Sequence, residues 1–173
     1  MNDTRYGKVI TGLVSLAFFG LLVAIDQFTK RLIMVNIPVT GDISVIDHVL
    51  KIVFVQNTGA AWGIFKNSTV FLAVFSCLVM AFMVFFFFRL DWKVKKHRPL
   101  MFICVLVTSG AFGNLLDRLL LKYVVDFIYI ELINFPVFNI ADCYITIPMI
   151  VLAFLLIFYY KDEDFNKIWP KKS

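Results

Sequence analysis

The chain has 173 residues, of which 61% are hydrophobic and 17% charged, with a mean hydropathy of +0.85. An average soluble domain is about 45 to 50% apolar and about 25% charged, and a chain of this size has too little interior to bury the excess. A soluble globule is therefore excluded, and lipid is the expected solvent. The net charge of +5 suggests nucleic acid as a partner, unless the positions of the basic residues provide another explanation.

Four uncharged apolar runs are long enough to cross about 30 Å of hydrocarbon as helices. They extend from Val9 to Ile25, from Asn67 to Phe88, from Pro99 to Leu116 and from Cys143 to Tyr160. Together with flanking residues they predict membrane spans at about 9–25, 67–88, 99–119 and 142–160. The first run is longer than the apolar core of a cleaved signal peptide, so it is interpreted as a retained span.

The Lys and Arg residues predict the orientation of these spans, because cytoplasmic loops retain positive charge. The N-terminus, the connection between the second and third spans and the C-terminal tail hold 11 of the 17 basic residues, and the other two connections hold 6. Both termini are therefore predicted to be cytoplasmic. This placement explains the basic excess without nucleic acid, and membrane lipids are the expected partners.

The two outer segments, at about 31–66 and 121–140, are rich in β-branched residues. Residues 43–46 and 50–55 predict short strands in the first segment, and residues 124–130 and 135–138 in the second. The sequence thus predicts an all-α integral membrane protein with four transmembrane helices and a small β-rich outer subdomain. We expect residues 1–173 to form a single membrane-embedded domain.

Ionisable residues beside hydrocarbon gather at the outer ends of the predicted spans, although each costs roughly 2.5 to 3.5 kcal/mol at a helix centre. They are Asp26, Lys30, Asp117, Arg118, Asp126 and Asp142. The first two are spaced for an i, i+4 ion pair on a helix. The adjacent Asp117 and Arg118 are interpreted in the same way.

Asp126 and Asp142 are the two carboxylates that stand apart. Asp126 lies within the apolar stretch 124–128, where burial should raise its pKa. Asp142 opens the fourth span, where the helix dipole alone would favour an acidic residue. Two carboxylates close together near lipid cannot both ionise without a large cost in free energy, so one of them should keep its proton. Aspartic-protease chemistry requires such a retained proton.

The sequence offers few residues for metal-dependent or disulfide chemistry. His48 and His97 are predicted on opposite sides of the membrane, and the three cysteines at different depths, so neither a metal site nor a disulfide is expected. The small residues of 109–113 are expected to form a helix-packing face. A small transporter or proton-relay subunit is the alternative for intramembrane carboxylates, and a structural assembly factor is a third possibility.

Five sequence blocks, in this order on a four-span frame, resemble the lipoprotein signal peptidases, also called signal peptidase II. The blocks are DQFTK at 26–30, NTGAAWG at 57–63, GNLLDRL at 113–119, VVDF at 124–127 and FNIAD at 138–142. The resemblance implies a membrane aspartic endopeptidase that removes signal peptides from diacylglyceryl-modified bacterial prolipoproteins. Such an enzyme cuts immediately before the lipidated cysteine.

The resemblance also implies roles for individual residues. Catalysis would fall on Asp126 and Asp142. Substrate-binding or supporting roles would fall on Asp26, Lys30, Asn57, Asn114, Asp117, Arg118 and Asn139. No cofactor or metal is expected. We expect a monomer in the bacterial cytoplasmic (inner) membrane, with its active site near the outer face.

Overall fold

The computed structural model describes residues 2–59, 68–161 and 163–164. Its four long helices are α1 (Asn2–Asn36), α2 (Thr69–Arg89), α3 (His97–Leu120) and α4 (Ile140–Phe158). All four are long and apolar enough to cross a membrane, which confirms the four predicted spans. Residues 60–63 of the second block, and the end of the first predicted outer segment, lie outside the described residues.

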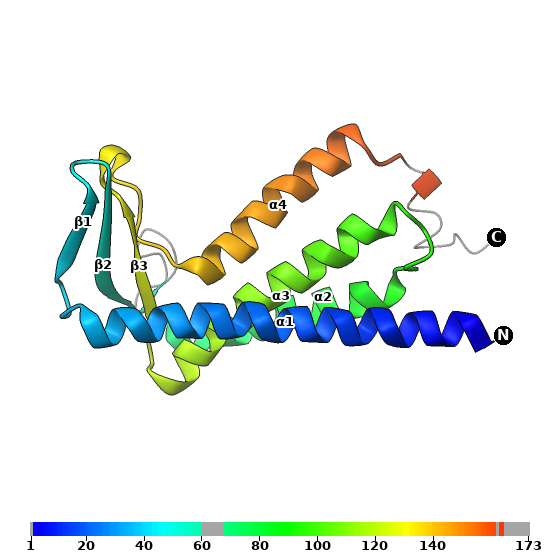
Figure 1. The fold of residues 1–173 in the computed structure, drawn as a ribbon, viewed down its shortest axis with the longest axis horizontal. Helices are drawn as coiled ribbons and strands as arrows, with labels where there is room; N and C mark the ends of the chain where they lie inside the picture. Colours follow the sequence, from blue (N-terminus) through cyan, green and yellow to red (C-terminus); the bar gives the residue numbers. More distant parts are fainter. Residues whose placement is uncertain (1, 60–67, 162, 165–173) are drawn as a thin grey trace.

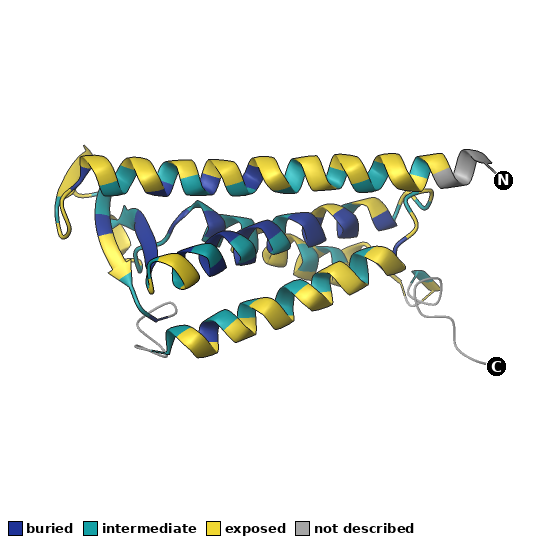
Figure 2. Ribbon diagram, turned by 90° about the horizontal axis from the view of Figure 1, so that it is seen from below, coloured by how far each residue is buried: buried dark blue, intermediate teal, exposed yellow. Residues whose placement is uncertain are grey.

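Helix α3 forms the centre of the helical bundle. In its most apolar 18-residue window 67% of the residues are buried, against 11% for α1 and α4 and 6% for α2. Figure 2 shows the same contrast, with buried positions concentrated on α3 and exposed positions along α1 and α4. The outward faces of the other helices are apolar, which is the pattern that contact with lipid requires.

Two helices begin or end beyond their predicted bounds. The first predicted span ended at Ile25, but α1 continues through Asp26 and Lys30 to Asn36. Residues 31–36, predicted to start the outer segment, are therefore helical. Helix α4 begins at Ile140 rather than at residue 142, because the side chain of Asn139 caps it.

A three-stranded antiparallel sheet lies at the end of the bundle opposite the N-terminus (Figure 1). Its strands are β1 (Asp42–Ile46), β2 (Leu50–Asn57) and β3 (Val124–Ile130), in the order β1-β2-β3. The two outer segments therefore form one sheet, and the fold class predicted from the sequence is confirmed.

The strand predicted at residues 135–138 is wrong. This stretch follows the short 3-10 helix η2 (Glu131–Ile133) and contributes only an isolated bridge between Ile128 and Phe138. Pro136 has no N–H group to donate to a strand ladder, which explains why pairing does not extend.

Strand β3 directs alternate side chains to opposite faces of the sheet. Val125 and Phe127 pack with Ile37 and Phe54 in a buried cluster that joins the sheet to the end of α1. Asp126 lies between them in sequence, so its carboxyl group projects from the other face. The alternation thus directs this acidic side chain away from the apolar cluster.

Helix α3 approaches its neighbours closely at two glycines. A Cβ atom on Gly110 would overlap the carbonyl oxygen of Ala141, and one on Gly113 would overlap the carboxylate of Asp26. The neighbouring Ser109 is fully buried. The predicted packing face at residues 109–113 is confirmed, and it brings α1 and α4 against the central helix.

Candidate active site

A buried charged cluster joins α1 to α3. The Nζ atom of Lys30 lies 2.9 Å from Oδ2 of Asp26 and 2.9 Å from Oδ2 of Asp117. The exposed fractions of Asp26, Lys30 and Asp117 are 0%, 1% and 2%. The predicted pairing of Asp26 with Lys30 is confirmed. The predicted pairing of Asp117 with Arg118 is wrong, because successive residues of a helix point about 100° apart and Asp117 is the one that faces Lys30.

The two carboxylates of this cluster are bound by further donors. Nε2 of Gln27 donates to Oδ2 of Asp26 at 3.1 Å and to Oδ1 of Asp117 at 3.0 Å. The backbone N–H groups of Ala141 and Val125 donate to Asp26 and Asp117 respectively. The cluster therefore connects α1 and α3 to the beginnings of α4 and β3. Gln27 was not among the predicted site residues, although it lies in the DQFTK block at 26–30, directly after Asp26.

Asp126 is a buried carboxyl group held by two amides. Its Oδ2 accepts a hydrogen bond from Nδ2 of Asn57 at 2.7 Å, and its Oδ1 accepts one from Nδ2 of Asn139 at 2.7 Å. Burial first, and then the nearby carboxylate of Asp142, raise the pKa of Asp126 to about 7, although the two amide donors lower it. The predicted upward shift of this pKa is confirmed.

Asp142 lies in the first turn of α4 and remains partly exposed. It forms a capping box with Asn139, in which Asn139 N donates to Asp142 Oδ2 and Asp142 N donates to Asn139 Oδ1, each at 3.0 Å. Its other oxygen, Oδ1, accepts from Nδ2 of Asn114 at 2.7 Å. The sequence suggested that Asp142 could be an acidic residue favoured at the N-terminus of a helix, and Asp142 does occupy that position.

Two asparagines connect the charged cluster to both carboxyl groups. Asn139 donates through Nδ2 to Asp126 and also to Oδ1 of Asn114, at 3.1 Å. Lys30 donates to the same Oδ1 atom at 2.9 Å. Because an ammonium group only donates, Lys30 directs the oxygen of Asn114 toward itself and thereby turns Nδ2 toward Asp142.

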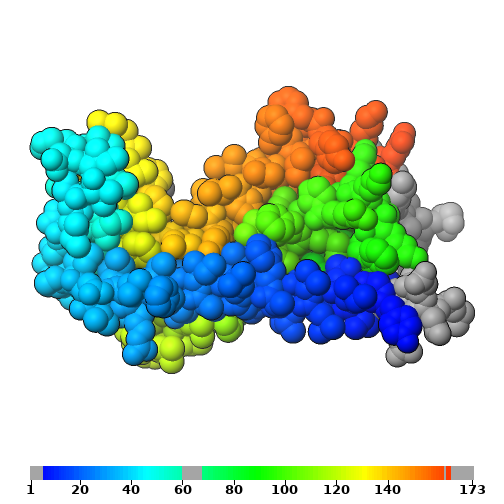
Figure 3. Space-filling model, viewed as in Figure 1, coloured from blue at the N-terminus to red at the C-terminus, as the bar shows by residue number. Residues whose placement is uncertain are grey.

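Arg118 and Asn57 complete the network from the sheet side. Arg118 donates to the carbonyl oxygens of Gly59 and Asn114, each at 3.3 Å. The N–H of Gly59 in turn donates to Oδ1 of Asn57 at 2.8 Å, which fixes the amide that binds Asp126. All nine predicted site residues thus belong to one network, to which the structure adds Gln27 and Gly59. Figure 3 shows the molecular surface hollowed at this end, between the sheet and α4.

The arrangement suits hydrolysis by paired carboxyl groups. One group has a pKa near neutrality and the other lies at a helix N-terminus, so a single proton can be retained between them. Within the described ranges, no cluster of three His, Cys, Asp or Glu side chains is arranged to hold a metal ion. Apart from His97 at the start of α3, the buried polar side chains among the described residues gather toward the sheet end of the bundle, whereas a transport pathway would distribute them through its depth.

The chain is similar to known proteins over most of its length. The family model described as Signal peptidase (SPase) II matches residues 18–158. Lipoprotein signal peptidases of Streptococcus thermophilus and Lactobacillus gasseri are 32% and 34% identical over 143 and 146 residues, which cover 83% of this chain and 90% and 91% of theirs.

Two solved structures of bacterial membrane enzymes, determined by the in meso method, have the same fold. The first, at 2.3 Å resolution, is 30% identical with a TM-score of 0.73 and covers 92% of this chain and 94% of its own. The second, at 1.9 Å resolution, is 31% identical with a TM-score of 0.70, and the match covers 85% of this chain and 94% of the other.

The four-span fold and the comparisons define the chain as a multi-pass bacterial membrane peptidase of the aspartic type. It belongs to the signal peptidase II family, whose members act on lipoprotein precursors. The resemblance noted in the sequence is confirmed, and the transporter alternative is not favoured.

Proposed function

We propose that Asp126 and Asp142 are the catalytic pair, and that the enzyme cuts diacylglyceryl-modified prolipoproteins immediately before the lipidated cysteine. The observation that carries the pair is the side chain of Asn139, which binds Asp126 through Nδ2 and the backbone N–H of Asp142 through Oδ1. Asn139 thereby links both residues: its side chain binds the carboxyl group of Asp126 on β3, and its backbone N–H binds the carboxyl group of Asp142 on α4. The names of the relatives support the substrate class.

In the proposed reaction Asp126 holds the proton, because its side chain is only 2% exposed whereas that of Asp142 remains partly exposed, and a buried carboxyl group favours its neutral form. We assign the ionised role to Asp142, which lies at the N-terminus of α4 and accepts hydrogen bonds from the backbone N–H of Asn139 and from Nδ2 of Asn114. Asp142 takes a proton from a water molecule that attacks the scissile carbonyl carbon. Asp126 donates a hydrogen bond to the carbonyl oxygen, and Asp142 then passes its proton to the leaving amine.

The remaining site residues act as positioning groups in this proposal. Lys30 and Asn114 orient Asp142, while Asn57 and Asn139 orient Asp126. Asp26 and Asp117 hold Lys30, and Arg118 holds the backbone at Gly59 beside Asn57. The hollow between the sheet and α4 is the proposed entrance for the precursor (Figure 3).

We further propose that this single-domain enzyme works as a monomer with its site at the outer membrane face and both termini in the cytoplasm. The excess of Lys and Arg in the N-terminus, the α2–α3 connection and the C-terminal tail supports this orientation. The site lies at the opposite end of the bundle from the N-terminus and the α2–α3 connection (Figure 1). Protease accessibility of the termini in sealed vesicles tests the orientation.

Substitution of the carboxyl groups tests the catalytic pair. In purified full-length enzyme, we expect Asp126→Asn and Asp142→Asn each to slow cleavage of a lipidated precursor by about 100- to 10,000-fold, the range for a general acid–base group. Asp47→Asn removes an exposed carboxylate from the β1–β2 turn and should leave the rate unchanged. Near wild-type activity of either site variant rejects the pair, and equal cleavage of an unmodified precursor rejects the lipid requirement.

A further inference from the structure

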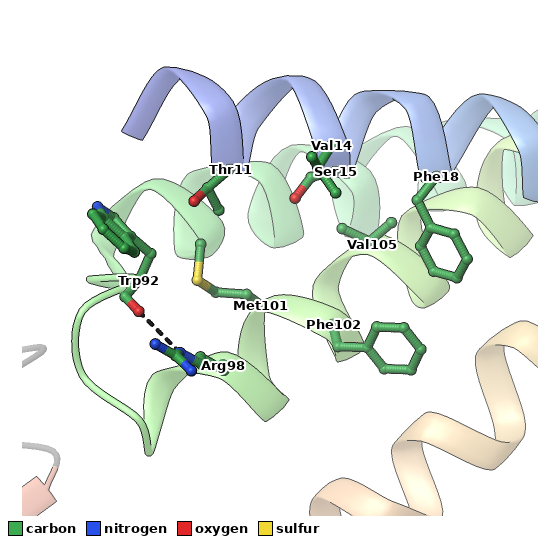
Figure 4. A pocket seen from close by; sticks show the side chains of 9 residues that line it. All are labelled: Thr11, Val14, Ser15, Phe18, Trp92, Arg98, Met101, Phe102 and Val105. Carbon is green, nitrogen blue, oxygen red and sulfur yellow. Dashed lines mark hydrogen bonds between the residues drawn. The ribbon is translucent and has the colours of Figure 1, made fainter. Parts of the chain in front are cut away.

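A cavity of about 510 Å³ opens between α1 and α3, in the half of the bundle away from the sheet (Figure 4). Its volume falls in the range of about 300 to 1,000 Å³ that is typical of small-molecule sites. Val14, Met101 and Val105 line it, and the rings of Phe18 and Phe102 stack at one end with centroids 5.5 Å apart. A lining of this kind favours a hydrocarbon chain and disfavours water.

The other end of the cavity is polar and basic. Trp92 and Arg98 lie there, and Nε of Arg98 donates to the backbone oxygen of Trp92 at 3.2 Å (Figure 4). Arg98 is exposed, and the connection from 89 to 98 holds five basic residues against the single acidic Asp91. Tryptophan and arginine are typical of the membrane interface, where one part of the side chain is apolar and the other is polar.

We propose that this cavity binds an acyl chain of an anionic phospholipid, with the lipid phosphate at Arg98. The apolar walls match the chain, and the basic rim matches the negatively charged head group. Basic pockets between transmembrane helices are known to bind such head groups. A lipid in this position would bridge α1 and α3 at the end of the bundle remote from the carboxylate pair, so it is distinct from the lipid carried by the substrate.

Native mass spectrometry of the purified full-length protein tests the proposal with two lipids of identical acyl chains, phosphatidylglycerol and the zwitterionic phosphatidylcholine. We expect the wild type to retain one phosphatidylglycerol in preference to phosphatidylcholine. Arg98→Gln should reduce this preference by about fivefold, the factor that one basic residue contributes near an anionic head group. Lys95→Gln removes the same charge from an exposed position outside the cavity, and it should retain most of the preference.

A second pair of variants tests the cavity itself. Ser15→Phe places a ring inside the cavity and should abolish lipid retention, whereas Leu16→Phe enlarges the next side chain on the exposed face of the same helix and should not. Circular dichroism verifies that all variants are folded. Equal retention of the two lipids by the wild type, or equal retention by the Ser15 and Leu16 variants, would overturn the proposal.

Discussion

Replacing Lys30 by methionine is the most direct test of the buried network, because Lys30 is its only ammonium group among the described residues. Methionine keeps most of the length and apolar surface of the lysine stem but removes the charge. The Nζ atom makes three contacts of 2.9 Å, to Asp26, Asp117 and Asn114. The variant therefore leaves two adjacent carboxylates buried without their cation.

We expect Lys30→Met to lose much of the free energy of unfolding, because no solvent reaches this cluster. Asp26 and Asp117 are 0% and 2% exposed, so water does not replace the lost partner. Removing one member of a buried ion pair costs about 3 to 5 kcal/mol. By contrast, Lys51 pairs with Glu131 at 2.6 Å while both side chains are 26% exposed, so Lys51→Met should cost no more than about 1 kcal/mol.

Unfolding of the purified protein in mixed detergent micelles, followed by circular dichroism, measures both losses. The double variant Lys30→Met with Asp26→Asn removes one of the two buried carboxylates that Lys30→Met leaves unpaired. It should therefore recover part of the stability that Lys30→Met loses. Cleavage should also slow in Lys30→Met, because Asn114 is no longer oriented toward Asp142. A loss below about 1 kcal/mol for Lys30→Met, or a double variant less stable than the single one, would refute this account of the cluster.

Two further predictions concern the pH profile and helix packing. Asn57→Ala removes a donor that stabilises the ionised form of Asp126; the pKa of Asp126 should rise further, and the fall in kcat/KM above neutral pH should move to higher pH. An unchanged descending limb would show that Asp126 does not hold the essential proton. Gly113→Ala would press a methyl group against Asp26 and should cost about 1 to 3 kcal/mol in the same unfolding assay. Gly20→Ala meets no atom within 4 Å and should be neutral or slightly stabilising, so equal losses for the two glycine variants would contradict the close approach of α1 and α3.

The sequence by itself determined the class of fold. A helix that contacts lipid needs an apolar run of a certain length, so hydropathy located all four spans. The predicted ends of the second, third and fourth spans lie within a few residues of the observed helix ends. The β-branched stretches likewise predicted β1, β2 and β3. It also singled out the carboxylates, because an acidic residue in an apolar stretch, such as Asp126, is costly and therefore conspicuous.

Only the tertiary structure decided how those residues are used. Hydropathy ended the first span at the charge of Asp26, yet α1 continues because Lys30, one turn further along the same helix, pairs with that charge. The partner of Asp117 proved to be Lys30 rather than the adjacent Arg118. Contacts such as Lys30 to Asn114 join residues 84 positions apart, and no local pattern encodes them. Composition and periodicity indicate the environment in which each segment can fold. The close approach of the helices at Gly113 and the register of β3 determine which polar groups come into contact.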